Sequence, residues 1–273
     1  MLVLDNVSVR LGAREVRGGV STLVQPGQLA IVVGPNGAGK STLMKVMTGE
    51  LAPGSGRVSL RGRPLGAFSP LALARERAVL PQSSALAFPF TVLEVVRLGM
   101  DGRAGLSPER RRREPIAALE RVELSGFGAR RFQELSGGEQ QRVHLARVLC
   151  QIGPPVEDGV AKTLFLDEPT SSLDIRHQIA VLEIARAFAD AGGAVLAILH
   201  DLNLAATFAD RMLVMHAGRI AAEGPPADVL ADGLLEKVFG IRLRVSQQPA
   251  AGRPFILPQS IEAGARPGIA ARA

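Results

Sequence analysis

Residues 29–42, LAIVVGPNGAGKST, limit the possible fold more than any other segment of the sequence. The apolar run LAIVV suits a buried parallel strand, and it leads directly into a glycine-rich loop. This loop matches the pattern G-x-x-x-x-G-K-[ST] through Gly34, Gly39, Lys40 and Ser41. A strand, a glycine loop and a helix in this order predict a phosphate-binding loop in an α/β fold whose sheet is mostly parallel.

The residue types of the loop suit nucleotide phosphates. Glycines let backbone amides wrap the phosphates, Lys40 is expected to reach the β and γ oxygens, and the Ser41 hydroxyl is suited to bind Mg²⁺. A purely structural glycine turn is the alternative, and the surrounding strand and helix pattern disfavours it. The predicted phosphate-binding residues are Gly34, Pro35, Asn36, Gly37, Ala38, Gly39, Lys40, Ser41 and Thr42.

Two further apolar runs end in polar residues. TLFL at residues 163–166 is followed by Asp167 and Glu168, and AVLAIL at residues 194–199 is followed by His200. Ligands bind beyond the carboxyl ends of parallel strands, so we expect Asp167 to hold Mg²⁺ through water and Glu168 to polarise an attacking water. A strand ending in Asp-Glu is more often a helix cap or a surface pair, but the phosphate loop strengthens the catalytic interpretation.

His200 is predicted to donate a hydrogen bond to a γ-phosphate oxygen, since it follows a strand of the same sheet. A lone histidine is usually structural, and we keep that interpretation for His144, His177 and His216. Gln82, at the end of AVLPQ, is a further catalytic candidate and the least specific.

The stretch ELSGGEQQRVHLAR at residues 134–147 contains a second glycine turn before a predicted helix. Amides freed by Gly137 and Gly138 at a helix N-terminus form a cradle for phosphate, with Ser136 beside them. This turn contains no lysine, and a chain of this size is expected to bind one nucleotide. The sequence therefore poses the question of why the chain carries two cradles.

The chain divides into four segments by pattern. Residues 1–82 contain the antiparallel strands VSVRLG and GRVSLRGRPL, with a hairpin around Gly62, and the phosphate loop. Residues 83–160 are predicted to be mainly helical, and residues 161–245 return to the core. Residues 246–273 form a C-terminal extension, and we expect its last 20 or so residues to be a loose tail.

Local signals place helices in the second segment. Thr91 and Glu94 form a predicted capping box at the start of a helix. Further helices are expected near residues 108–122 and 138–151. The stretch GPPVEDG at residues 153–159 is predicted to be a loop.

Composition argues against several classes of protein. The net charge is +6, but the densest basic run, ERRRRE at residues 109–114, is expected on a solvated helix, and the chain has no Tyr or Trp on which nucleic-acid bases stack. No apolar run approaches the roughly 20 residues that cross a bilayer. The first residues lack the features of an export signal, and the single Cys150 fits a reducing cytosol.

In their order along the chain, these motifs resemble those of ATP-binding-cassette (ABC) ATPases. The resemblance spans about residues 1–225 and is carried by GPNGAGKST, Gln82, LSGGEQ, LFLDEP, SSLD and His200. It implies an α/β fold: a P-loop NTPase ABC cassette with a RecA-like core, an N-terminal antiparallel β subdomain and an inserted α-helical subdomain. It also implies ATP hydrolysis with Mg²⁺. The implied catalytic residues are Glu168, His200, Lys40 and Gln82, and the implied metal-binding residues are Ser41, Gln82 and Asp167.

The resemblance also answers the question of the two cradles. In that family two nucleotide-binding subunits pair head to tail, and each ATP lies between the phosphate loop of one subunit and the LSGGEQ turn of the other. Lys40 and Mg²⁺ of the opposite subunit then supply the positive charge. The loop around Ser172 and Asp174 is implied to cross the same interface. The residues implied to bind nucleotide at the second cradle are Ser136, Gly137, Gly138 and Glu139.

One feature departs from the family pattern. Members usually stack adenine on an aromatic residue in the first hairpin, whereas this chain has Leu11 there and no aromatic residue from 1 to 67. Apolar contact from Leu11 or Val16 is expected to substitute. Since base stacking is worth about 1–3 kcal/mol, we expect nucleotide affinity to be somewhat weak.

The sequence around the motifs resembles one branch of the family. No long coiled-coil insertion, second cassette or membrane span is present in the sequence, which leaves a detached subunit of an importer. Residues 200–230 resemble the branch that handles iron chelates, haem and cobalamin, and residues 77–99, PPVEDG and GLLEKVFGIRLRV look most like hemin importer ATPases. The alternatives are the same role for a ferric siderophore or cobalamin, or a regulatory nucleic-acid-associated ATPase.

The resemblance implies partners and a location. It implies a homodimer of ATPase subunits bound to an integral-membrane permease dimer at the cytoplasmic face of the inner membrane. A periplasmic substrate-binding protein is an indirect partner, and no direct contact with nucleic acid is expected. Phe88 and Phe90 either line a groove for a permease helix or belong to the core of the helical segment, and the sequence leaves both interpretations open.

Overall fold

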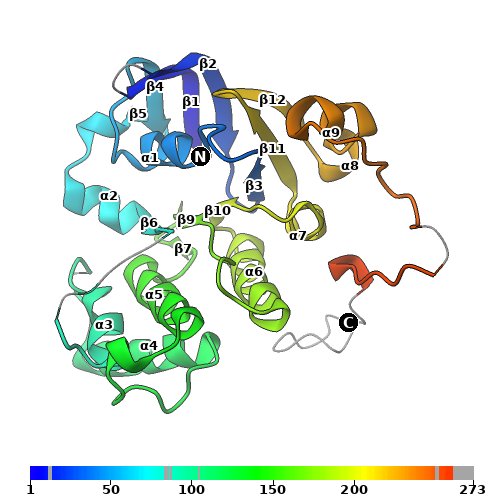
Figure 1. The fold of residues 1–273 in the computed structure, drawn as a ribbon. Helices are drawn as coiled ribbons and strands as arrows, with labels where there is room; N and C mark the ends of the chain where they lie inside the picture. The colour runs from blue at the N-terminus through cyan, green and yellow to red at the C-terminus, as the bar shows by residue number, and fades with distance from the viewer. Residues whose placement is uncertain (12–13, 83–85, 87, 104, 250–251, 261–273) are drawn as a thin grey trace.

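The computed structural model describes residues 1–11, 14–82, 86, 88–103, 105–249 and 252–260, with the side chains of residues 10–18 outside that description. Within this part of the chain, the strands form a larger mixed sheet, a smaller antiparallel sheet and one short hairpin. Figure 1 shows the two sheets in one half of the molecule and a group of helices, α3, α4 and α5, in the other half.

The larger sheet has the strand order β12-β11-β3-β10-β9-β6. Its strands are parallel except β12, which pairs antiparallel with β11. The prediction of buried parallel strands is confirmed, because every residue of β3, β9 and β10 is buried. The strands are β3 (Leu29–Val33), β6 (Arg77–Leu80), β9 (Thr163–Asp167), β10 (Ala194–Ile198), β11 (Arg211–His216) and β12 (Arg219–Gly224).

The smaller sheet has the order β2-β1-β4-β5 and is antiparallel. The predicted hairpin around Gly62 is confirmed, since β4 and β5 pair across a turn in which Gly62 has φ +77°. Such a φ suits glycine because it has no Cβ. The strands are β1 (Leu2–Leu11), β2 (Arg14–Val24), β4 (Ser55–Leu60) and β5 (Arg63–Pro64).

The helices cover both faces of the larger sheet. The α-helices are α1 (Lys40–Thr48), α2 (Pro70–Glu76), α3 (Val92–Leu98), α4 (Pro108–Arg121), α5 (Gly137–Ile152), α6 (Ile175–Asp190), α7 (Leu202–Phe208), α8 (Pro226–Val229) and α9 (Asp232–Phe239). Short 3₁₀ turns are η1 (Leu65–Ala67), η2 (Phe132–Glu134) and η3 (Pro258–Ser260).

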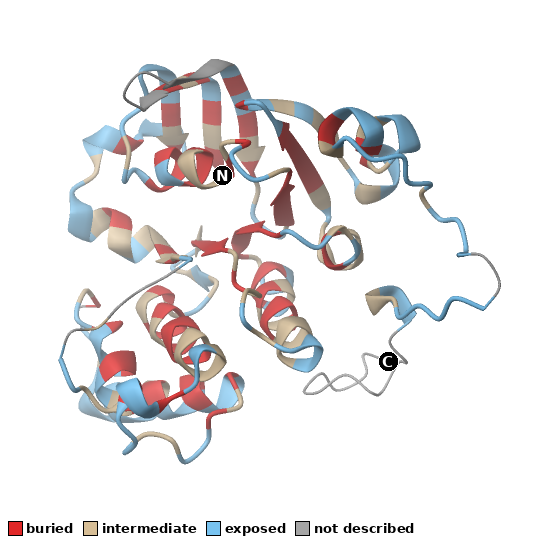
Figure 2. Cartoon of the chain, in the orientation of Figure 1, coloured by how far each residue is buried: buried red, intermediate tan, exposed pale blue. Residues whose placement is uncertain are grey.

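Alternate residues of β3 face opposite sides of the sheet and join different core clusters. Leu29, Ile31 and Val33 pack in the cluster that contains buried residues of α3, α4, α5 and α6. Ala30 and Val32 pack in the cluster that contains α1, β1 and β4. Figure 2 shows the buried positions on the inner sides of these elements. The central strands are therefore held from both faces, which fixes the loops at their carboxyl ends.

Several local predictions are confirmed and one is wrong. Thr91 and Glu94 form both hydrogen bonds of the capping box, and α4 and α5 lie within one residue of the predicted ranges. GPPVEDG, predicted as a loop, instead forms part of a hairpin of β7 (Val156–Glu157) and β8 (Val160–Ala161). The glycine at 159, with φ +74°, supplies the turn. The sequence prediction recognised the turn residues but not the short pairing around them.

The C-terminal extension returns to the core. In Figure 1 the chain leaves α9, and η3 lies below α7. The side-chain amide of Gln259 donates to the backbone oxygen of Asn203 on α7 at 3.2 Å. The expected loose tail therefore contacts the core up to Ser260, and residues 261–273 lie outside the described part.

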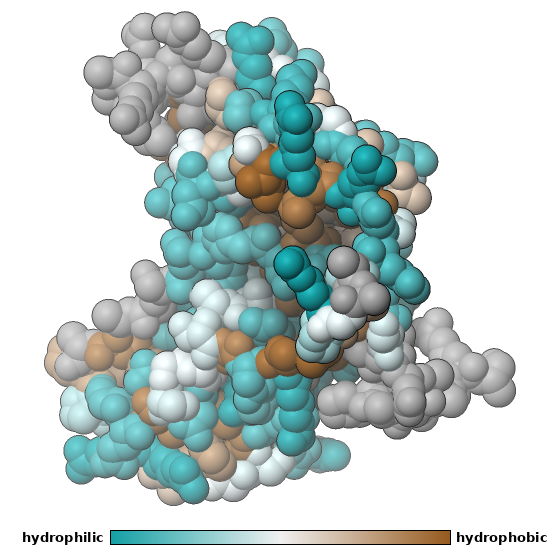
Figure 3. Space-filling model, turned by 45° about the vertical axis from the view of Figure 1, so that its right-hand side comes forward, coloured by the Kyte–Doolittle hydropathy of each residue, from teal (hydrophilic) through white to brown (hydrophobic). Residues whose placement is uncertain are grey.

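Polar residues cover most of the face shown in Figure 3, and apolar surface is confined to separate patches. In the described residues, no helix has the length and apolar character that a membrane span needs. The arginines of ERRRRE are exposed on α4, as expected, with an ion pair between Arg113 and Glu109 at 3.2 Å.

Candidate functional site

The glycine loop lies between β3 and α1, as its sequence predicts. Gly34 has φ +149°, and a Cβ at this position would lie 2.2 Å from the carbonyl oxygen of Met215 on β11. Only glycine lets the loop pass this close to the neighbouring strand. Gly39 has φ +100° and caps α1 without a side-chain hydrogen bond, so the amides of the first helical turn stay available to a ligand.

Lys40 is buried inside this loop. Its Nζ donates to the carbonyl oxygens of Gly34 at 2.9 Å and of Pro35 at 3.0 Å. Burial lowers the pKa of Lys40, and the charges of Glu168 and Asp167 partly oppose that shift. The loop thus holds the lysine head at its centre, where phosphate oxygens would replace the carbonyls as partners.

Asp167 lies beside Ser41 at the end of β9. The Ser41 hydroxyl donates to Oδ1 of Asp167 at 3.3 Å, and the carboxylate is buried. Burial, and to a lesser extent the charge of Glu168, raises the pKa of Asp167. A hydroxyl and a carboxylate next to a phosphate loop fit Mg²⁺, which uses oxygen ligands and few protein carboxylates when it binds with nucleotide phosphates. The donor set therefore fits the metal that the sequence predicts.

Glu168 is held between Gln82 and His200. One carboxylate oxygen accepts from Nε2 of Gln82 at 2.7 Å, and the other lies 2.7 Å from Nε2 of His200. These residues follow three neighbouring strands, β6, β9 and β10, so the sheet order brings them together. Glu168 also has φ +50°, a left-handed conformation that is uncommon for residues other than glycine and occurs at functional sites.

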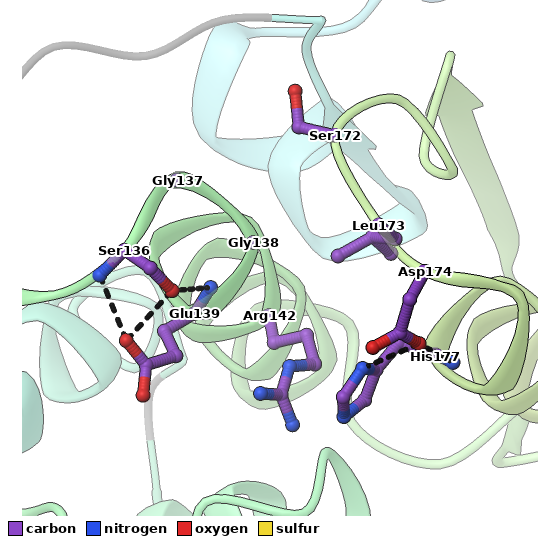
Figure 4. Close-up of a pocket in the computed structure, with 9 residues that line it drawn as sticks. All are labelled: Ser136, Gly137, Gly138, Glu139, Arg142, Ser172, Leu173, Asp174 and His177. Atoms are coloured by element: carbon purple, nitrogen blue, oxygen red, sulfur yellow. Dashed lines mark hydrogen bonds and ion pairs between the residues drawn. The ribbon is translucent and has the colours of Figure 1, made fainter.

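The second cradle lies at a different pocket, of about 320 Å³, between the start of α5 and the loop before α6 (Figure 4). Ser136 and Glu139 form a capping box there: the Ser136 amide and hydroxyl both donate to Oε2 of Glu139 at 2.7 Å. These bonds lower the pKa of Glu139. None of the residues that line this pocket belongs to the phosphate loop, so within the described chain the two cradles are separate.

The two loops of this pocket touch at Gly138. A Cβ added to Gly138 would lie 3.1 Å from the Leu173 side chain and 3.2 Å from the Ser172 carbonyl oxygen. A larger residue would therefore push the α5 turn away from the loop before α6. Glycine at this position permits the close approach.

Two residues that line the pocket were not among the predicted site residues. His177, assigned a structural role, lines the pocket, and its Nδ1 lies 2.8 Å from Oδ1 of Asp174. Arg142 is buried and also lines the pocket. Figure 4 shows both side chains directed towards the space between the helices. The sequence does signal that Asp174 and His177 lie close together, because their three-residue spacing is that of a helix N-cap and the residue whose amide it accepts.

The two phenylalanines near Gln82 differ in environment. Phe88 is 69% exposed, whereas Phe90 is partly buried and packs against the core that includes α3 and α5. The core interpretation therefore fits Phe90, and the surface interpretation fits Phe88. The predicted contacts of Leu11 and Val16 with adenine concern side chains outside the described part.

Comparison with known proteins gives consistent results. A model of the ABC transporter family matches residues 18–171. The chain is 55% identical to the hemin import ATP-binding protein HmuV of Mesorhizobium japonicum and 52% identical to that of Rhizobium meliloti. Each alignment covers 95% of this chain and 99% of the relative.

Two solved structures share the fold. An ATP-binding subunit of an ABC transporter is similar with a TM-score of 0.74 at 27% identity, covering 89% of this chain and 94% of that one. A dimeric ATP-binding cassette in a post-hydrolysis state, bound to ADP and phosphate, is similar with a TM-score of 0.72 at 26% identity, covering 83% and 99%. With its phosphate loop, its Asp167 and Glu168 pair and its second glycine turn in place, the chain belongs to the ABC transporter family as one of its ATP-hydrolysing proteins.

Proposed function

We propose that this protein is the ATPase subunit that drives hemin uptake through an ABC importer of the bacterial inner membrane. One observation carries the hydrolytic part: the Glu168 carboxylate lies between Gln82 and His200, next to the loop that holds Lys40. The hemin part is supported by relatives at 48–55% identity that are named hemin import ATP-binding proteins.

In the proposed reaction, water attacks the γ-phosphate of ATP. Glu168 accepts a hydrogen bond or a proton from that water; Gln82 and His200 hold its carboxylate before nucleotide binds. Lys40 and His200 donate to γ-phosphate oxygens and stabilise the charge that develops there. Backbone amides from Gly34 to Thr42 surround the phosphates. Ser41 and Asp167 would hold Mg²⁺, which would supply further charge stabilisation, and Gln82 donates to the adjacent Glu168.

The proposed active form is a head-to-tail homodimer. The subunit carries its two phosphate cradles at separate places, so one ATP cannot use both within a single chain. In the dimer, Ser136 and the amides near Gly138 contact the nucleotide bound to the partner's phosphate loop. The Glu139 carboxylate must release the Ser136 hydroxyl for this contact. The similarity to a dimeric cassette supports this arrangement.

The proposed membrane partner is a permease dimer, with the ATPase bound at its cytoplasmic face. Phe88 lies close to Gln82 in sequence and is exposed, so it is suited to contact a permease helix and to move when Gln82 contacts nucleotide. The proposed division of the chain keeps residues 1–82 and 161–245 as the ATP-binding core and residues 83–160 as the helical subdomain.

Hemin itself is carried by the permease and a periplasmic binding protein.

Transport measured in membrane vesicles tests the proposal. The ATPase is reconstituted with a hemin-type permease dimer, and uptake of hemin, a ferric siderophore and cobalamin is compared at equal ATP. Hemin uptake that needs ATP and is lost with Glu168→Gln supports the proposal. Preferred uptake of the siderophore or cobalamin would contradict the cargo, and ATPase activity that depends on nucleic acid would contradict the class.

A further inference from the structure

Glu123 occupies a backbone position that glycine normally fills. It follows α4 with φ +58°, its amide donates to Glu120 O at 3.0 Å, and the next amide, of Leu124, donates to Leu119 O at 2.9 Å. These two bonds form a Schellman motif, whose left-handed residue is usually glycine. At this φ glutamate costs more conformational free energy than glycine, which indicates that the Glu123 side chain has a structural or functional role.

The Glu123 carboxylate contacts the start of α6. Its Oε2 lies 3.0 Å from a guanidinium nitrogen of Arg176 and 3.6 Å from Nε2 of His177. The other ring nitrogen of His177 lies 2.8 Å from Oδ1 of Asp174, which also accepts the backbone amide of His177 at 2.9 Å. The carboxylate of Glu123 therefore lies against His177, whose other ring nitrogen contacts Asp174, the N-cap of α6.

The backbone of Glu123 contacts α5 on another side. Arg142 of α5, which is buried, donates to the carbonyl oxygens of Val122 at 3.0 Å and Glu123 at 3.3 Å. α5 begins immediately after Ser136, so Arg142 lies on the helix that carries the second cradle. In Figure 4 Arg142, Asp174 and His177 come from these two helices and converge on one pocket.

We propose that Glu123 is a positioning residue that sets the α5 turn against the loop before α6. Its backbone is tied to α5 and its side chain to α6, and a Cβ at Gly138 would crowd Ser172 and Leu173. Both loops belong to the surface that the subunit presents to its partner in the proposed dimer, on which this inference rests. The spacing of the two loops decides whether the partner's ATP and the loop around Ser172 fit at the same time.

Substitutions at Glu123 separate the carboxylate from the backbone. Glu123→Ala removes the carboxylate and keeps the left-handed strain, and Glu123→Gly removes both. Glu120→Ala, on the same helix at an exposed position, is the matched control. Measured quantities are kcat and KM for ATP, nucleotide affinity of the single subunit, thermal unfolding, and ATP-driven dimer formation in a Glu168→Gln background.

Both Glu123 variants are expected to lower kcat on the order of tenfold and to weaken dimer formation, because a small displacement of a contributing loop is costly. Single-subunit nucleotide affinity should stay within about twofold, and Glu123→Gly should unfold at the same or a higher temperature. Arg176→Ala should reproduce part of the loss in a chain whose backbone at residue 123 is unaltered.

Recovery of wild-type kcat and dimer formation in Glu123→Gly would overturn the proposal, because the carboxylate would then be dispensable. Wild-type behaviour of both Glu123→Ala and Arg176→Ala would do the same. A wild-type protein that hydrolyses no ATP would instead refute the proposed function. These outcomes are distinguishable in one set of assays.

Discussion

Nε2 of His200 lies 2.7 Å from Oε1 of Glu168, at the ends of two adjacent strands. The residue expected to contact the γ-phosphate is thus already bonded to the residue expected to act on the water. A γ-phosphate oxygen that accepts from Nε2 would displace its hydrogen bond to Glu168, because Nε2 carries only one proton. This hydrogen bond therefore couples ATP binding at His200 to the freeing of the Glu168 carboxylate from His200.

Glu168→Gln is expected to stop turnover while leaving nucleotide binding intact. The amide keeps the size of the side chain but cannot accept a proton, so kcat should fall at least about a hundredfold. An ATP-bound dimer should then accumulate, visible as a shift in size-exclusion elution that requires ATP. Hydrolysis at the wild-type rate would refute the role assigned to Glu168.

His200→Ala is expected to lower kcat between about tenfold and a hundredfold with little change in ATP affinity, because the side chain acts on the phosphate and on Glu168. His216→Ala is the matched control, since His216 is an exposed histidine at the end of β11. Steady-state kinetics and nucleotide titration check both variants. Equal losses in the two variants would show that the effect is not specific to His200.

Asp167→Asn is expected to stabilise the empty subunit and to weaken its stabilisation by Mg²⁺ with ATP. Burial and Glu168 raise the pKa of Asp167 above its ordinary value of 3.8, so the charged carboxylate opposes folding at neutral pH. That penalty is relieved as pH falls through the raised pKa towards 3.8. Thermal scans at pH 7.5 should therefore show a higher unfolding temperature for the variant than for the wild type.

The same scans offer a second check on Asp167. The difference in unfolding temperature between wild type and Asp167→Asn should shrink as pH is lowered, because the wild-type carboxylate becomes neutral. Mg²⁺ with ATP should raise the unfolding temperature of the wild type much more than that of the variant. A difference that grows at low pH would contradict the direction of the pKa shift.

Gly34→Ala is expected to destabilise the fold by about 3 kcal/mol or more and to abolish nucleotide binding. Its Cβ would lie 2.2 Å from a backbone oxygen of β11, which cannot move without disturbing the sheet. Gly66→Ala, where a Cβ meets open space, is the control and should unfold like the wild type. Denaturant unfolding and nucleotide titration measure both effects. A stable Gly34→Ala variant would show that β11 yields at this contact.

Phe88→Ala is expected to reduce transport several-fold while leaving the fold and the basal ATPase rate unchanged. The ring is 69% exposed, so its removal costs little stability. Phe255→Ala, which removes another exposed ring far along the chain, serves as the control. Vesicle uptake measured beside ATP consumption gives the coupling ratio. A wild-type coupling ratio for Phe88→Ala would argue against a permease contact at this residue.

The sequence predicts the core strands and the groups at their ends because buried parallel strands and a phosphate loop leave strong local patterns. The contact of Gln82 with Glu168 was not predictable, because it depends on β6 lying beside β9. In that pairing Arg77 lies opposite Thr163, which comes 86 residues later in the sequence. The hairpin at residues 156–161 was missed because strands of two residues carry no periodic signal.

The second cradle shows the same limit. Ser136, Gly137 and Gly138 are recognisable as a helix start, and the structure places them there. His177 and Arg142 were not recognisable as its neighbours, because their pocket forms only when the start of α5 and the loop before α6 come together in the fold. Glu123 carried no signal at all: a charged residue after a helix looks like ordinary surface until its φ is known.

The left-handed backbone of Glu168 also limits how this enzyme can be altered by random mutagenesis. Side chains branched at Cβ, such as Val, Ile and Thr, are strained at a φ of +50°, so codons for them should disappear from a library on folding grounds alone. Gly, Asn and Asp should be enriched among the folded variants at this codon. A screen for loss of activity must therefore score soluble yield separately, so that misfolding is not mistaken for a catalytic effect.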